Sequence, residues 1–165
     1  MRASLFALVL TAGAVISTAA RADCTDPPRP GVNWQRCRND SRNFAKANLS
    51  GATIRDAKFE RADLTGADLS NADGRRAKFV NVKAANASFE NARLTETDFT
   101  SAHLQGASFR GARLDRARFY RADLRGADFT DAKLDGVDFL EADLSGATWV
   151  DGVTVCSEGS ISQCN

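Results

Sequence analysis

Residues 62–71 read ADLTGADLSN, two copies of a five-residue unit in which alanine precedes leucine by two positions. The same frame runs from Phe44 to Trp149, where every fifth residue is apolar and usually bulky, with Gly74 and Ala84 as the small exceptions. A fixed short period of this kind is typical of a solenoid, in which each repeat packs only against its neighbours. We expect two residues of every five to point inward and three, mostly polar, to face water.

The aromatic residues indicate how many units form one coil. Phenylalanines recur at a spacing of 20 residues in two series, Phe59 to Phe139 and Phe89 to Phe129, and Trp149 extends the second series. Twenty residues are four units, which predicts a four-sided coil in which like side chains stack on like. The 22 units would form about 5.5 coils (22/4), spaced by about 4.8 Å as strands are in a sheet. A period of five matches neither a helix nor a flat strand.

The repeat resembles that of the pentapeptide-repeat family, whose units read approximately Ala-(Asp/Asn)-Leu-x-x, and the resemblance covers residues 42–151. It implies an all-β fold, a right-handed quadrilateral parallel β-helix. Some cytosolic members look like DNA duplexes, with strongly acidic surfaces that occupy topoisomerases. The charge of this chain does not fit that role: without Arg2 and Arg21 its 22 basic residues become 20, against 21 acidic, a net charge of −1. We therefore expect no nucleic-acid partner.

Residues 1–22 have the pattern of a cleaved signal peptide. A basic start is followed by an apolar run over residues 5–16 and by a small-residue cleavage site, Ala20-Arg21-Ala22. The run is too short to span a membrane. The pattern predicts cleavage before Asp23 and a periplasmic or secreted bacterial protein with no membrane attachment after cleavage.

The mature chain is expected to consist of a cap at residues 23–41, the repeats at 42–151 and a second cap at 152–165. Caps are needed because an open β-helix exposes a bare backbone edge at each end. All four cysteines lie in the caps, and three pairings are open to them. Because the stack holds the caps further apart than a disulfide reaches, local pairing is favoured. The predicted bridges are Cys24–Cys37 and Cys156–Cys164.

The sequence contains no strong signal for catalysis. The single histidine, His103, lies in an outward position with Asp123 and Asp143 above it and Lys83 below it at the spacing of 20. An aspartate before the central residue belongs to the repeat, so we interpret this group as solvated surface. Carbohydrate lyases that use β-helices build their sites from long loops, and the repeats contain no insertion. We predict no catalytic residue, no metal ligand and no cofactor.

One side of the coil, centred on Gly74 and Leu94, is predicted to be basic. Three of its cations recur at one position in successive coils, and like charges stacked directly are unfavourable in a sheet. Either nearby acids (Glu96, Asp115 and Asp135) neutralise them or they bind an anionic ligand. The residues of this candidate anion-binding face are Arg75, Arg76, Arg93, Arg113, Arg116 and Lys133, of which Arg93, Arg113 and Lys133 share the stacked position.

A second surface feature is apolar. Val80, Tyr120 and Leu140 share one outward position, with Thr100 between them. A ladder of exposed apolar residues is a candidate protein contact or homodimer seam.

The leading hypothesis is therefore a non-enzymatic, exported β-solenoid that acts as a scaffold or protein-interaction surface in the bacterial envelope. The alternative is a binder of an anionic envelope glycan or polymer through the basic face. The third hypothesis is an enzyme acting on an envelope glycan.

Overall fold

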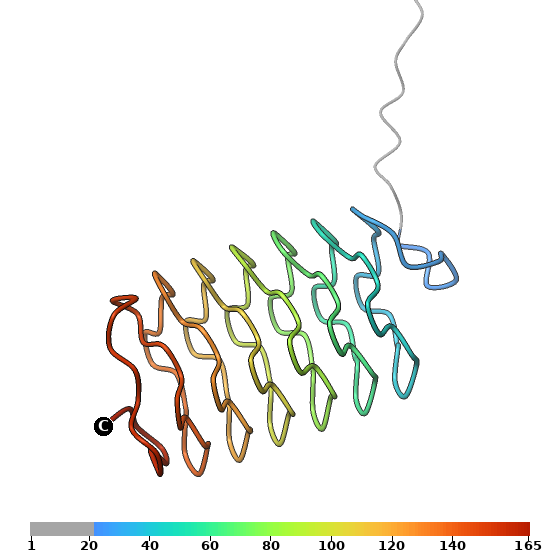
Figure 1. The fold of residues 1–165 in the computed structure, drawn as a ribbon. Coiled ribbons are helices and arrows are strands. Elements are labelled where there is room, and N and C mark those ends of the chain that lie inside the picture. Colours follow the sequence, from blue (N-terminus) through green and yellow to red (C-terminus); the bar gives the residue numbers. More distant parts are fainter. Residues whose placement is uncertain (1–21) are drawn as a thin grey trace, which may run out of the picture.

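The computed structural model describes residues 22–165, so the predicted signal peptide lies outside the described residues except for Ala22. The chain winds into a stack of similar coils along one axis (Figure 1). Parallel bridges join residues that are 20 positions apart, from Asn33–Thr53 to Asp128–Thr148. Residues 22–165 contain no α-helix, and the β structure consists of single-residue bridges rather than longer strands. They also include no helix long and apolar enough to cross a membrane.

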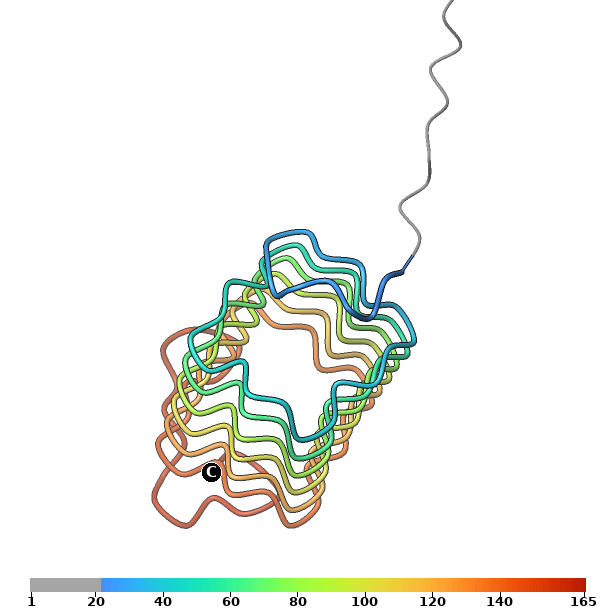
Figure 2. The same ribbon diagram turned by 90° about the vertical axis from the view of Figure 1, so that its right-hand side faces the viewer.

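Each five-residue unit consists of one bridge and one turn, which gives the coil its four sides (Figure 2). The turn is closed by a main-chain hydrogen bond from the residue after the corner, as from the Ala57 N–H to the Ile54 carbonyl oxygen at 3.2 Å. The corner residue has a positive φ in every unit, 65° at Gly51 and 57° at Arg61. Glycine adopts this conformation freely and other residues at some cost. The repeated backbone therefore imposes it on side chains of every kind.

The core confirms the two predicted phenylalanine series. In each series the rings stack with centroids 4.9 to 5.4 Å apart and planes within 12° of parallel. The two series meet edge to face, with centroids 5.6 to 6.2 Å apart and planes 77° to 89° from parallel. Both arrangements suit the ring quadrupole. The alanines two positions before the central residues are buried as well, which leaves a dense, dry interior.

The small central residue Gly74 leaves no room for a larger side chain. A Cβ atom placed on Gly74 would lie 3.0 Å from Leu94 Cδ2 and 3.5 Å from Ile54 Cδ1, so the neighbouring coils fill the space. The buried Thr97, which stands where most units have alanine, donates a hydrogen bond of 3.0 Å to the Gly74 carbonyl oxygen. The hydroxyl that Thr97 buries is thus satisfied by a main-chain oxygen of the preceding coil.

The coil begins before residue 42. Val32, Trp34, Cys37 and Asn39 are buried in the register of the repeat, and bridges start at Asn33. Only the segment before residue 31 is irregular, and it is held to the stack by a hydrogen bond from the Trp34 indole N–H to the Asp26 carbonyl oxygen. The first coil therefore has the register of the repeat without its composition.

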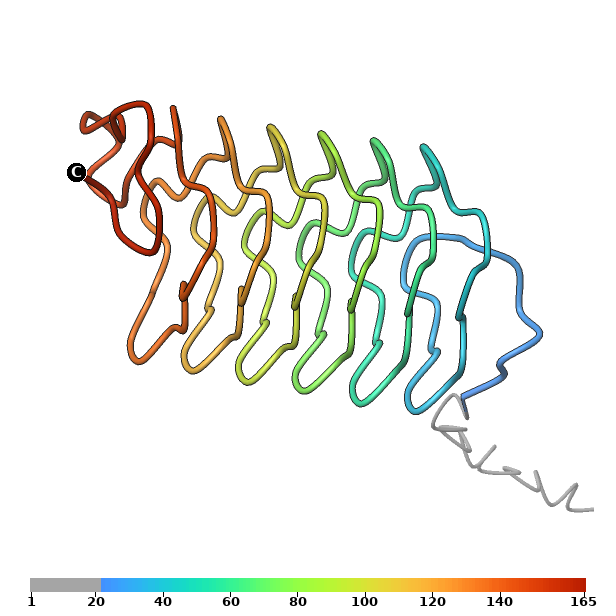
Figure 3. The same cartoon turned by 90° about the horizontal axis from the view of Figure 1, so that it is seen from below.

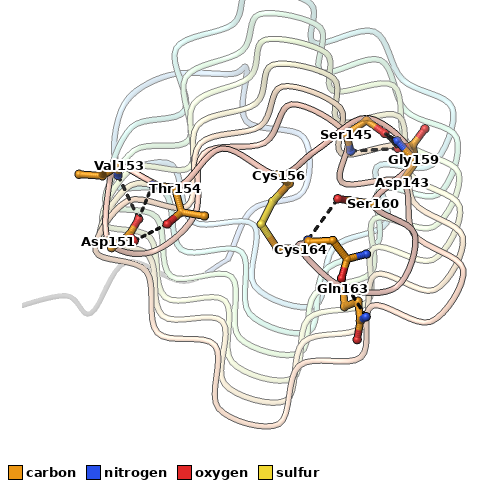
Figure 4. The surroundings of a disulfide bond; sticks show 11 residues. Asp143, Ser145, Asp151, Val153, Thr154, Cys156, Gly159, Ser160, Gln163 and Cys164 are labelled. Carbon is orange, nitrogen blue, oxygen red and sulfur yellow. Dashed lines mark hydrogen bonds between the residues drawn. A yellow bond between two sulfur atoms is a disulfide. The ribbon is translucent and has the colours of Figure 1, made fainter.

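Both predicted disulfides are confirmed. Cys24 bonds to Cys37, and Cys156 bonds to Cys164. The two ends of the stack are far apart (Figure 3), which is why the bridges are local. The second bridge lies at the C-terminal end, between the group around Ser145 and Gly159 on one side and the Asp151–Thr154 turn on the other (Figure 4). There the chain reverses, and its last segment pairs antiparallel with the final coil.

Candidate functional site

Three cations of the predicted anion-binding face lie in one column. Bridges join Arg93 to Arg113 and Arg113 to Lys133, so the three side chains leave successive coils at equivalent points. All three residues are exposed. Their alignment follows from the backbone alone, because each bridge repeats every 20 residues.

A pocket with a volume of about 290 Å³ opens beside this column, lined by Arg75, Arg93, Thr95 and Arg113. Arg93 has no ion pair within 4 Å among residues 22–165, and Arg113 has only a long contact of 3.8 Å with Asp115. The guanidinium group presents a planar fork of donors that matches carboxylate, phosphate and sulfate oxygens. The pocket is therefore suited chemically to an anion.

Arg75 is held in place at the edge of this pocket by Asp73. Its guanidinium donates to both carboxylate oxygens of Asp73 at 3.0 Å, and Arg55 from the preceding coil donates to the same carboxylate at 2.8 Å. Burial opposes ionisation of Asp73, but the hydrogen bonds from Arg75 and Arg55 outweigh it and keep its pKa below the usual value. The carboxylate is thus charged and saturated with cations.

The two remaining predicted members of the basic face, Arg76 and Arg116, lie in one column of corner residues, with Glu96 between them. Arg76 pairs with Asp56 at 2.8 Å, and Arg116 pairs with Glu96 at 3.4 Å. They border a second pocket of about 440 Å³ whose lining mixes both signs of charge. Of the acids expected to neutralise the column, Asp115 approaches Arg113, whereas Glu96 pairs with Arg116 instead. The anion-binding role remains a prediction for the pocket residues.

The sequence analysis missed Thr95 as a pocket residue. The spacing of 20 residues places Thr95 above Arg75 and below Asp115, so its position beside Arg75 could have been predicted from the repeat.

The predicted apolar contact residues lie at one corner of the coil. Val80, Thr100 and Tyr120 are half-buried, and Leu140 is 57% exposed. The Tyr120 hydroxyl donates to Glu141 at 3.1 Å, and the Arg121 guanidinium lies 4.9 Å from the ring centroid. These contacts tie the tyrosine to neighbouring charged side chains, and the apolar column ends in Leu140.

His103 stacks below Asp123 as the spacing predicts, but the structure engages Asp123 elsewhere. The Arg125 guanidinium donates to both Asp123 oxygens at 2.8 and 2.7 Å. These bonds are the main reason why the Asp123 pKa is lowered. Within residues 22–165 no hydrogen bond or ion pair joins His103 to Asp123, and no cluster of His, Cys, Asp and Glu side chains is arranged for a metal ion.

Comparison with known proteins identifies the repeat. The model of the pentapeptide repeat region matches residues 52–129 and 85–158, together well over half of the chain. A pentapeptide repeat protein of the Arabidopsis thaliana thylakoid lumen is 27% identical, with a TM-score of 0.50, over 65% of this chain and 68% of that chain. HetL of Nostoc sp. strain PCC 7120 is also 27% identical, with a TM-score of 0.43, over 74% of this chain and 63% of that chain.

The plasmid-mediated fluoroquinolone resistance protein QnrB1 is 18% identical, with a TM-score of 0.40, over 67% of this chain and 71% of that chain. A comparison with curated proteins found no match. The repeat model, its register in the coil and the solved structure of the lumenal protein agree: this chain belongs to the pentapeptide repeat family.

Proposed function

We propose that this protein is a non-enzymatic scaffold of the bacterial envelope that holds a partner protein against its surface. The observation that carries the proposal is the apolar column of Val80, Thr100, Tyr120 and Leu140, which is aligned by a bridge ladder without an inserted loop. A rigid ladder keeps such side chains at fixed spacing, which lowers the ordering cost of binding. Export is supported by the two disulfides and by the lumenal location of a similar protein.

In a pull-down from envelope extract, we expect negative charges introduced into the apolar column to release the partner protein. The double variant Val80→Glu and Tyr120→Glu should retain at most about a tenth of the bound protein, since buried carboxylates at a contact are strongly unfavourable. The measurement is quantitative mass spectrometry of proteins captured by the purified chain. The matched control, Ser50→Glu with Ser70→Glu, places the same charges at the equivalent position of another side. Equal retention by the two variants contradicts the proposal.

The arginine pocket favours a second candidate function, the binding of an anionic envelope polymer. Its specific support is Arg93, which lines the pocket and has no ion pair among the described residues. A column with one cation in each of three successive coils matches a repeating polyanion better than a compact one, because both have charges at regular spacing. Because the net charge of the mature chain is close to zero, any attraction to a polyanion must come from this basic side of the coil.

For this candidate we expect the triple variant Arg93→Gln, Arg113→Gln and Lys133→Gln to bind heparin and dextran sulfate more weakly. Removing three contacts should reduce the slope of log affinity against log salt by roughly two to three. Affinity is measured by titration at several salt concentrations. The control removes three cations that are already paired outside this face, Arg110, Arg121 and Arg125, each replaced by Gln. No binding by the wild type at low ionic strength would reject the candidate.

A further inference from the structure

The final coil is closed by the protein's own C-terminal segment on two of its four sides. On one side the Ala142 carbonyl oxygen accepts from the Ser162 N–H, and the Leu144 N–H donates to the Ser160 carbonyl oxygen, both at 2.9 Å. On the next side the equivalent groups of Ala147 and Trp149 are paired with Cys156 and Thr154. The pairing is antiparallel on both sides, at Asp143–Ile161 and Thr148–Val155. The coil end can therefore take a partner segment running in the opposite direction.

The other two sides of the final coil, residues 131–140, have no such cover, and we call them the open edge. In the preceding coil the Leu114 and Phe119 N–H groups donate to the carbonyl oxygens of Lys133 and Asp138. In the open edge the corresponding groups have no hydrogen-bond partner within residues 22–165. They are the carbonyl oxygens of Ala132 and Val137 and the N–H groups of Leu134, Gly136 and Phe139.

The open edge also exposes core side chains. Ala132, Leu134, Val137 and Phe139 are only partly buried, whereas the equivalent residues of the preceding coil are buried completely. Leu140 adds a 57% exposed side chain, so the apolar column of the proposed protein contact runs directly into this end. The cap with the Cys156–Cys164 bridge is visible on one part of the coil end in Figure 4. Unpaired main-chain groups beside apolar side chains are the features that an added strand satisfies.

The net charge of the open edge indicates the charge of the partner segment that would bind there. Residues 131–140 contain three acidic residues and one basic residue, Lys133, so their net charge is −2. The acidic residues are Asp131, Asp135 and Asp138. Asp131 and Asp135 have no ion pair within 4 Å among residues 22–165, and the contact of Asp138 with Arg118 is long, at 3.9 Å. A second copy of this edge would bring carboxylates together. A basic partner segment would neutralise them instead.

We propose that the open edge binds a segment of a partner protein in which apolar side chains recur every five residues, with basic side chains between them. The segment pairs in the antiparallel sense used by the protein's own cap. Its apolar side chains cover Leu134 and Phe139, and its basic side chains face Asp131 and Asp135. The inference rests on the proposed protein-interaction function and specifies the chemistry of the partner.

The test uses hydrogen exchange of the purified chain, read by NMR at single amides. The probe is an acetylated nine-residue peptide with valine at positions 2 and 7, glycine at position 5 for the corner, and lysine elsewhere. We expect exchange at the Leu134, Gly136 and Phe139 amides to slow by about tenfold or more at saturation, because these donors become hydrogen-bonded. Amides that are already paired, such as that of Leu114, serve as the internal reference. Two control peptides carry glutamate in place of lysine, or N-methyl groups on alternate backbone nitrogens, and neither should protect the edge.

A charge variant tests the partner chemistry separately. The double variant Asp131→Asn with Asp135→Asn should lower the affinity for the valine–lysine peptide by roughly three- to tenfold. Glu60→Gln with Asp68→Asn removes the same charge from distant coils and should leave affinity unchanged. Absence of protection, equal protection by the glutamate peptide, or protection that grows with protein concentration alone would each overturn the proposal. The pull-down on Val80 and Tyr120 leaves the open edge intact, so its outcome distinguishes failure of this inference from failure of the scaffold function.

Discussion

Replacing Phe99 by alanine is expected to lower the free energy of unfolding by about 3–5 kcal/mol. The Phe99 ring is completely buried, and it stacks on Phe79 at 5.0 Å and on Phe119 at 4.9 Å. It also meets Phe89 and Phe109 edge to face. The truncation would leave a cavity in the middle of both ring series, and the bridge ladder prevents the coils from closing it. Urea denaturation followed by far-UV circular dichroism measures the effect.

The control for this prediction is Tyr120→Ser, one residue beyond the central Phe119 of the next coil. Tyr120 is half-buried, and its hydroxyl bonds to the exposed Glu141. We expect its loss to cost less than about 1 kcal/mol, as is usual for surface contacts. Comparable losses from Phe99→Ala and Tyr120→Ser would show that the inside and outside of the coil have been assigned incorrectly.

Removing the Cys24–Cys37 disulfide is expected to destabilise the protein by about 3 kcal/mol, mainly because the unfolded chain gains freedom. The bridge spans a sequence separation of 13, against 8 for Cys156–Cys164, so the second should cost slightly less, about 2.6 kcal/mol. Alanine is the appropriate replacement, since Cys37 and Cys156 are buried and a serine hydroxyl there would add its own penalty. The double variants Cys24→Ala with Cys37→Ala and Cys156→Ala with Cys164→Ala are compared with the wild type by urea denaturation under non-reducing conditions.

Mass mapping of non-reduced digests is the control for the disulfide prediction. It should link Cys24 to Cys37 and Cys156 to Cys164 in the wild type, and each double variant should retain the other bridge. A loss below about 1 kcal/mol in both variants would contradict the chain-entropy account. It would show that the ends of the coil contribute little to the cooperative unit.

The candidate site could be predicted only in part. The register placed Arg93, Arg113 and Lys133 in one column, since a bridge between residues 20 apart aligns their Cα atoms. It did not reveal that Arg76 and Arg116 turn toward carboxylates, while Arg93 has no ion pair with any residue that the structure describes. An arginine side chain reaches acids on its own coil and on both neighbouring coils. The choice among them depends on local packing, which the repeat does not encode.

The amino-acid sequence by itself determined the period of five, the coil of 20 residues, the inward and outward positions and the local disulfides. The period and the coil follow from the spacing of hydrophobic residues. The local disulfides follow from the limited reach of a disulfide and from the number of residues between the cysteines. Both spacings can be read from the sequence. Only the tertiary structure decided that the Thr97 hydroxyl bonds to the Gly74 carbonyl oxygen, that the coil begins at Gly31 and that the C-terminal segment covers half of the final coil. Each of these depends on contacts between segments outside the repeat or departing from it. No period connects such segments, so their pairing is determined by shape, hydrogen bonding and burial in the folded molecule.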